Sequence, residues 1–471
     1  MRRLTMTAVT ACAAALVLTS APDTGAAAAA PLGAGLFPTS WYEAPVIRER
    51  PSWLPADLSR DATVILVPGT SDFTEVTGDD IVGGSSAVGG DQYERTVSIG
   101  FYDPNDPQVR FVDYPQAFGF VVGDTTLNLV GTGTYNDSVD AGTVAGLAAA
   151  EAAWAAQGKT GTIILNGYSQ SVPVAMNVAY LLHQKSLAGD PDAIPDADVV
   201  VINGADTRFP NTGIESVFPS IIDGVYTNGP RDESATGDIR VISYCVRGDA
   251  VCGLGNPLAH PFATLFYLGP GATIHGQKGD LVNQYDVISQ TQVGATTYVV
   301  LDGGNPWGIF LRSMGIPVPT AFDDALDELV PVPMPGERST VNGVDIPTPR
   351  ELQVQIAAKL GLPVPVTDPD AMAAAGQTWK APPLTTTPRT TTPITTSANT
   401  TGRAATTTTT PVTTTDRQSL GDVLSGLATT AVGSTTVTGS SGPAPAPRST
   451  GDDAPTSAST TSAVTSATPA S

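Results

Sequence analysis

The sequence predicts an α/β fold in which helices cover both faces of a parallel sheet. Short, continuous apolar runs predict strands that are buried on both faces. Alanine- and leucine-rich stretches between these runs predict the helices, and strands that alternate with helices are typical of a parallel sheet. The clearest predicted strands lie at residues 63–67, 161–165, 198–202 and 239–244, and the clearest helices at 137–157 and 172–187, the first capped by Asp137 or Ser138.

The first thirty residues predict a secretory signal peptide. Arg2 and Arg3 supply its positive start, residues 6–18 form a short apolar stretch, and the small residues 26–30 offer a cleavage region. The apolar stretch is too short to span a bilayer, and no later segment reaches about twenty apolar residues. The sequence therefore predicts a protein that is secreted or held in the cell envelope, without a transmembrane segment.

The rest of the chain divides by composition. Residues 31–60 are expected to form an N-terminal extension, 61–360 a globular domain, and 361–380 a linker. Residues 381–471 consist mainly of Thr, Ser, Pro and Ala. Because such a tail cannot bury enough apolar surface to offset its ordering entropy, it predicts a disordered spacer of the kind that is often O-glycosylated.

Charge and cysteine content exclude several functions. The chain has 471 residues and a formal net charge of −22, which argues against binding to nucleic acid or to an anionic membrane. Of its three cysteines, Cys12 is lost with the signal peptide. In an oxidising compartment the remaining pair, Cys245 and Cys252, predicts a disulfide rather than a metal site. No metal and no cofactor are expected.

The strongest motif is Gly-Tyr-Ser-Gln-Ser at residues 167–171, between a predicted strand and a predicted helix. A serine on a sharp strand-to-helix turn between two small residues is typical of a nucleophile elbow. Ser171 stands where glycine is usual, and it is small enough to fit. Ser169 is therefore the candidate nucleophile, and the alternative is an ordinary turn with a cap-like serine.

A serine nucleophile needs a histidine base, and the chain offers three histidines. His183 lies on the helix that leaves the elbow, roughly 20 Å along its axis, and is too far away. His275 lies among small residues that predict a loop, whereas His260 precedes an aromatic-rich helical run that suits packing. His275 is the preferred base, and His260 is the alternative.

The base needs an acid to orient it. Asp249 lies between Cys245 and Cys252, so a disulfide would hold it at the tip of a small ring. The alternative is that the disulfide only stabilises the loop and Asp249 has no catalytic role. In that case Asp206 or Asp223 would be the acid.

The oxyanion hole is expected to use two main-chain N–H groups. One belongs to Gln170, directly after the candidate nucleophile. The other belongs to the turn that follows the first strong strand, where Thr70 is the preferred donor and Ser71 its alternative. The same Gly-Thr-Ser sequence is also compatible with a plain turn.

These motifs resemble those of cutinases, which are α/β-hydrolase serine esterases. Over residues 61–333 the chain also resembles the PE-PPE domain of mycobacteria and their relatives, which is itself similar to cutinases. That resemblance is carried by Tyr114-Pro115, the Gly167-to-Ser171 motif, Asn256-Pro-Leu, Ile274-His275-Gly276 and Thr296-to-Leu301. It implies an esterase, lipase or acyltransferase that acts on fatty acyl esters, with Ser169, Asp249 and His275 as its triad, in an actinobacterial cell envelope.

Two features depart from the family pattern. The helical module that often precedes a PE-PPE domain is replaced by the signal peptide. His275 also lies further beyond Asp249 than in compact cutinases. The intervening residues 255–271, which include Phe262 and Leu265, form either a lid or acyl wall over the site or a plain part of the core.

Three further functions remain open at this stage. An acyltransferase would pass acyl or mycolyl groups between trehalose-type glycolipids of the cell wall, through the same acyl-enzyme. A non-catalytic protein would bind the envelope on a hydrolase scaffold, although the joint presence of triad, oxyanion and disulfide candidates argues against it. A structural wall protein would depend mainly on the Thr/Pro-rich tail.

Overall fold

The computed structural model describes residues 51–55, 58, 62–70, 75–77, 80–82, 108–275 and 285–383. The chain divides into two compact units at residue 398, and all described residues belong to the first. The predicted signal peptide, the Thr/Pro-rich tail beyond residue 383 and Ser71 lie outside the described residues.

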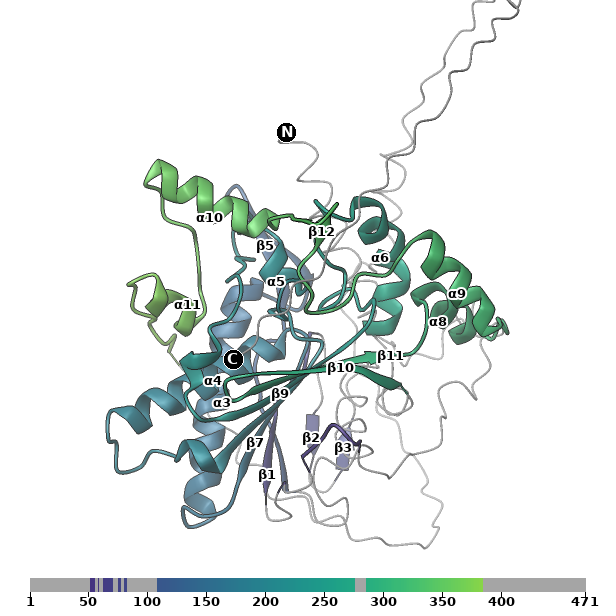
Figure 1. Cartoon of the computed structure of the whole chain (residues 1–471). Helices are drawn as coiled ribbons and strands as arrows, with labels where there is room; N and C mark the ends of the chain where they lie inside the picture. The colour runs from purple at the N-terminus through teal and green to yellow at the C-terminus, as the bar shows by residue number, and fades with distance from the viewer. Residues whose placement is uncertain are drawn as a thin grey trace, which may run out of the picture. The chain divides into compact units, whose positions relative to one another are not determined.

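A seven-stranded sheet forms the centre of the described unit, with the strand order β10-β11-β9-β8-β7-β1-β4 (Figure 1). Every neighbouring pair is parallel except β10 and β11. Five of these strands (β1, β7, β8, β9 and β11) are buried along most of their length and rich in β-branched residues, as expected where both faces are covered. The strands are β1 (Thr63–Leu66), β4 (Gln108–Phe111), β7 (Ile163–Tyr168), β8 (Val199–Gly204), β9 (Arg240–Val246), β10 (Asp286–Val293) and β11 (Thr296–Asp302).

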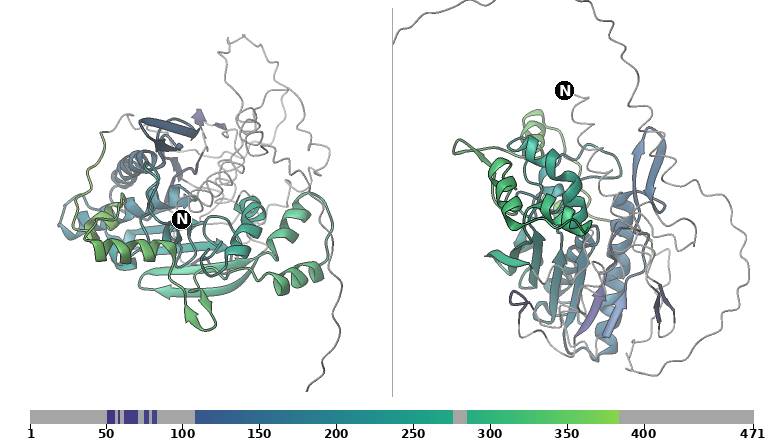
Figure 2. Two further views of the ribbon diagram at one scale, coloured as in Figure 1. Left: turned by 90° about the horizontal axis from the view of Figure 1, so that it is seen from above. Right: turned by 90° about the vertical axis from the view of Figure 1, so that its right-hand side faces the viewer.

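Helices cover both faces of this sheet, which confirms the predicted α/β fold (Figure 2). On one face, α3 (Tyr135–Ala156) and α4 (Ser171–Leu187) pack on strand residues such as Leu165. On the other face, a second core joins Ile164 of β7 to residues of α6 (Pro261–His275) and α8 (Pro306–Ser313). Alternation along each strand divides its side chains between the two cores.

The remaining elements are short. They are the hairpins β2–β3 (Glu75–Thr77, Asp80–Val82), β5–β6 (Phe118–Val122, Thr125–Val130) and β12–β13 (Thr340–Val341, Val344–Asp345), the helices α5 (Ile214–Val217), α9 (Thr320–Leu329), α10 (Pro349–Leu360) and α11 (Pro369–Ala374), and the 3₁₀ turns η2 (Asp196–Asp198) and η3 (Glu233–Thr236). Within the described parts of the chain, no helix is both long and apolar enough to cross a membrane.

The cap of α3 differs from the one expected. Thr134, not Asp137 or Ser138, is the N-cap, and its hydroxyl accepts a hydrogen bond from the Asp137 amide at 3.1 Å. The hydroxyl of Ser138 instead accepts from the Ala117 amide at 2.9 Å. The helix begins one turn earlier than expected because tertiary packing buries Tyr135 at its start.

The described unit reaches beyond residues 61–360 at both ends. Within the expected N-terminal extension, Trp53 is buried and its ring packs 5.2 Å from that of Tyr244. Within the expected linker, Asp368 is buried and forms an ion pair of 3.0 Å with Arg208. The described residues of both segments therefore include packed parts of the fold.

Candidate active site

Ser169 occupies the turn between β7 and α4 in a strained conformation. Its φ is 59°, in the left-handed region that residues other than glycine rarely adopt. The turn is tight: a Cβ at Gly167 would lie 2.8 Å from the Ser171 carbonyl oxygen and 2.9 Å from Asn203 Oδ1. Glycine at this position allows the strand and the helix to approach closely. The local geometry is that of a nucleophile elbow.

Ser171 has a role that the sequence does not reveal. Its hydroxyl accepts a hydrogen bond from the Tyr168 amide at 2.7 Å and donates to the Tyr168 carbonyl at 2.9 Å. A glycine could make neither bond. The residue that departs from the usual elbow pattern therefore closes the turn around Ser169.

His275 lies within hydrogen-bonding distance of both Ser169 and Asp249. His275 Nε2 is 2.9 Å from Ser169 Oγ, and His275 Nδ1 is 3.1 Å from Asp249 Oδ2 and 3.2 Å from Asp249 Oδ1. A carboxylate only accepts hydrogen bonds, so Nδ1 carries the proton and Nε2 is free to accept from the serine hydroxyl. All three residues are buried, with 4%, 5% and 1% exposure for serine, histidine and aspartate.

His275 is the last residue of α6, where the sequence suggested a loop. Gly269, Pro270 and Gly271 disfavour a helix, because proline lacks an N–H and glycine is flexible. Tertiary contact overrides this preference: Gly271 accepts a hydrogen bond from the Ala250 amide at 3.2 Å. A Cβ on Gly271 would also lie 2.4 Å from the Gly248 carbonyl oxygen. The helix end thus packs directly against the loop that carries Asp249.

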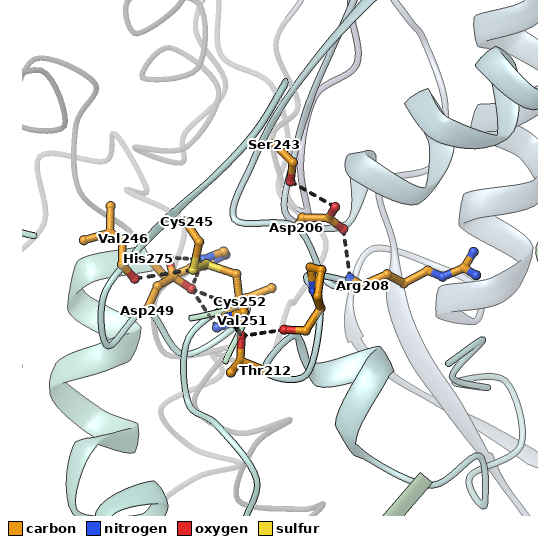
Figure 3. The surroundings of a disulfide bond; sticks show 12 residues. Asp206, Arg208, Thr212, Ser243, Cys245, Val246, Asp249, Val251, Cys252 and His275 are labelled. Carbon is orange, nitrogen blue, oxygen red and sulfur yellow. Dashed lines mark hydrogen bonds and ion pairs between the residues drawn. A yellow bond between two sulfur atoms is a disulfide. The ribbon is translucent and has the colours of Figure 1, made fainter. Parts of the chain in front are cut away.

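The predicted disulfide is present between Cys245 and Cys252 and encloses Asp249 (Figure 3). Asp249 Oδ1 accepts hydrogen bonds from the amides of Val251 at 2.7 Å and Cys252 at 3.3 Å. The Asp249 amide donates to the Val246 carbonyl at 3.0 Å. The ring and these bonds together fix the direction in which the carboxylate points.

The other two histidines lie away from Ser169. His183 Nδ1 is 2.7 Å from Asp196 Oδ2, at the far end of α4. His260 directly precedes α6, a helix of 15 residues that ends at His275. Such a helix is about 22 Å long, so His260 and His275 lie at opposite ends of it.

The two alternative acids are engaged elsewhere. Asp206 is fully buried and accepts hydrogen bonds from Arg231 at 2.7 and 3.3 Å. It also accepts from the Ser243 hydroxyl at 3.1 Å, and Figure 3 shows it apart from the disulfide ring. Asp223 accepts from the Tyr226 hydroxyl at 2.9 Å at an exposed position. Neither has His275 among its hydrogen-bond partners in the described structure.

Thr70 and Gln170 meet beside the elbow. The Thr70 hydroxyl donates to Gln170 Oε1 at 2.9 Å, and Gln170 Nε2 donates to the Ala117 carbonyl at 2.7 Å. The main-chain N–H of Gln170 lies at the N-terminus of α4, where the helix dipole favours negative charge. Gln170 is adjacent to Ser169 in the chain, and Thr70 contacts the Gln170 side chain; their oxyanion role remains a prediction.

Residues 255–271 include both core side chains and exposed apolar side chains, and a lid or acyl wall formed by them remains a prediction. Tyr267 is buried and its hydroxyl donates to the Val330 carbonyl at 2.5 Å, so this side of α6 is core. Phe262 and Leu265, on the same helix, are 65% and 70% exposed.

In the described residues no group of three or more His, Cys, Asp or Glu side chains is placed to hold a metal ion.

Comparison with known proteins adds little to this geometry. No family model matches the chain, and no curated protein matches it. Among solved structures, an acetylxylan esterase is 20% identical with a TM-score of 0.26, covering 45% of this chain and 97% of its own. A cutinase-like protein from Cryptococcus sp. is 16% identical with a TM-score of 0.24, covering 48% of this chain and 96% of its own. At these scores neither likeness carries an argument, and the resemblance to PE-PPE domains stays a prediction.

Proposed function

We propose that the chain is a secreted serine esterase that cleaves acyl esters through a covalent acyl-enzyme. The observation that carries this proposal is the continuous series of contacts from Asp249 through His275 to Ser169, in which the two closest distances are 3.1 and 2.9 Å. The strained elbow supports it independently, because such strain is characteristic of functional sites.

In the proposed reaction, Ser169 Oγ attacks the ester carbonyl while His275 Nε2 takes the hydroxyl proton. Asp249 holds the Nδ1 proton and stabilises the imidazolium. The negative charge on the tetrahedral oxygen is stabilised by the N–H of Gln170 and by Thr70. The C–O bond then breaks, and the leaving alcohol receives the proton from His275. A water molecule, deprotonated by the same histidine, releases the acid and restores the serine.

The proposed substrates are lipids or other acyl esters of the cell envelope, including cell-wall glycolipids. The predicted signal peptide supports an extracellular site of action. Phe262 and Leu265 expose an apolar surface on α6, and a lipid substrate is compatible with that surface. A sugar hydroxyl in place of water would turn the same acyl-enzyme into the intermediate of an acyltransferase.

The test is labelling of the purified protein with a fluorophosphonate probe, followed by mass spectrometry of the modified peptide. We expect one label, on Ser169, and hydrolysis of p-nitrophenyl butyrate by the same preparation. A protein that takes no label and cleaves no ester contradicts the proposal. Adding trehalose to the ester assay then separates the two acceptors, because acyl transfer yields acyl-trehalose in place of free acid.

A further inference from the structure

Tyr168 is the last residue of β7 and directly precedes Ser169. Alternation along the strand directs Leu165 to the core under α3 and α4, and Ile164 to the core that contains Ile274 of α6. Tyr168 is four residues beyond Ile164, so it points to the same side of the sheet. The strand therefore directs the tyrosine ring toward the helix that carries His275.

Two contacts join Tyr168 to His275. The Tyr168 hydroxyl donates to the His275 carbonyl at 2.5 Å. The two rings stack with centroids 5.1 Å apart and an interplanar angle of 25°. His275 is the last residue of α6 as the structure describes it. A single side chain thus fixes both the main chain of His275 and the plane of its imidazole.

Tyr168 also packs in the buried cluster that contains Cys245 and Cys252, the disulfide around Asp249. The sheet leaves space for its ring: Gly204 of β8 lies opposite Tyr168 in the strand register. A Cβ at Gly204 would lie 2.7 Å from Tyr168 Cδ2. The tyrosine is thereby linked to Ser169 by the chain, to His275 by stacking and a hydrogen bond, and to the disulfide around Asp249 by packing.

We propose that Tyr168 is a positioning residue that holds the His275 imidazole in line with Ser169, an inference that rests on the proposed function. When the histidine accepts the serine proton it becomes an imidazolium, and the face of a stacked aromatic ring stabilises a cation. Rotation of the imidazole away from Ser169 breaks this stack. Tyr168 touches the base and not the reacting atoms, so its effect is exerted through His275.

The experiment compares Tyr168→Leu, which removes the stacked ring, with Tyr168→Phe, which removes only the hydroxyl. Both are assayed with p-nitrophenyl butyrate over a pH series that separates kcat from KM. For Tyr168→Leu we expect kcat to fall about a hundredfold with little change in KM, since a misplaced catalytic group costs about that factor. For Tyr168→Phe we expect a loss of about fivefold, equivalent to one hydrogen bond.

The pH profile distinguishes positioning from a structural role. The stacked ring favours the imidazolium, so removing it makes the base harder to protonate. The acid limb of kcat/KM should therefore move to lower pH by about half a unit in Tyr168→Leu. In Tyr168→Phe the stack remains and the limb should not move.

Tyr298→Phe is the matched control. Tyr298 is buried in the same cluster, and its hydroxyl donates to Glu233 at 2.9 Å, away from the proposed triad. We expect its kcat to stay within about twofold of wild type, the effect of one modest hydrogen bond lost at a distance. An equal loss in Tyr298→Phe and Tyr168→Phe overturns the inference, because loss of any tyrosine hydroxyl in this cluster would then explain both.

A folded Tyr168→Leu protein with nearly unchanged kcat also overturns the inference. If that variant does not fold, Tyr168→Phe decides, and an unchanged kcat in it counts against the positioning role. A wild-type protein that neither cleaves the ester nor takes the fluorophosphonate label overturns the proposed function and this inference with it. Active wild type with unaffected Tyr168 variants overturns this inference alone.

Discussion

The Asp249 carboxylate lies 3.1 Å from Nδ1 of His275 and is enclosed by the Cys245–Cys252 disulfide. The sequence separation of these two cysteines is only 7 residues. A ring this small stabilises the fold modestly, by roughly 2–3 kcal/mol in the chain-entropy model. Its larger effect is expected on the orientation of the acid, because both the disulfide and the amides of the loop hold the carboxylate toward the histidine.

Asp249→Asn should lower kcat by about 10⁴ while leaving the disulfide and the fold intact, since an amide no longer holds the imidazole in the required tautomer. A Cys245→Ser/Cys252→Ser variant should keep its circular dichroism spectrum and lose much of its turnover. Activity and thermal unfolding are measured for both proteins. If the double variant unfolds readily and Asp249→Asn is fully active, the disulfide contributes to stability only and does not orient the acid.

The histidines allow a direct test of the base. His275→Ala should lower kcat by on the order of 10⁶, as should Ser169→Ala, because the members of a triad act as a unit. His260→Ala is the matched control, because His260 lies at the other end of α6 and should retain most of the activity. The assignment is reversed if the His260 variant is inactive and the His275 variant is active.

Local sequence patterns predicted the sheet, the disulfide and the residues that meet at the elbow. Ser169 follows an apolar run and precedes a predicted helix, so its turn is recognisable from neighbours alone. Asp249 is recognisable because two cysteines flank it. In the structure His275 lies within hydrogen-bonding distance of both Ser169 and Asp249. The catalytic role of the three residues remains a prediction.

Features that depend on distant contacts were not predictable. The helical end at His275 follows from packing of Gly271 on the Asp249 loop, and this overrides a Gly-Pro-Gly sequence. The stack of Tyr168 on His275 joins residues that are 107 apart in the sequence. Asp368 lies in a stretch with the composition of a linker, and it is the contact with distant residues such as Arg208 that shows the segment is docked.

Thr70→Ala tests the second side of the oxyanion site. The Thr70 hydroxyl holds the Gln170 side chain at 2.9 Å, next to the elbow. Removing it should lower kcat by about 10- to 100-fold, somewhat less than the loss of a direct oxyanion donor. Thr70→Ser keeps the hydroxyl and should retain near wild-type kcat. Equal activity in the two variants would mean that the hydroxyl contributes nothing to the reaction.

The docking of the C-terminal segment is tested by Asp368→Ala. Asp368 and Arg208 are both 2% exposed and lie 3.0 Å apart, and Arg208 keeps a second partner in Asp370 at 2.9 Å. Removing one partner of a buried pair leaves a poorly compensated charge, so we expect a loss of about 3 kcal/mol in the free energy of unfolding, at the lower end of the usual range. Urea denaturation measures this loss of stability.

The control is Asp345→Ala. Asp345 pairs with Arg338 at 3.2 Å but is 62% exposed, and loss of such a surface pair costs about 0–1 kcal/mol. Equal stabilities of the two variants would mean that residues 361–380 rest on the domain without contributing to its stability.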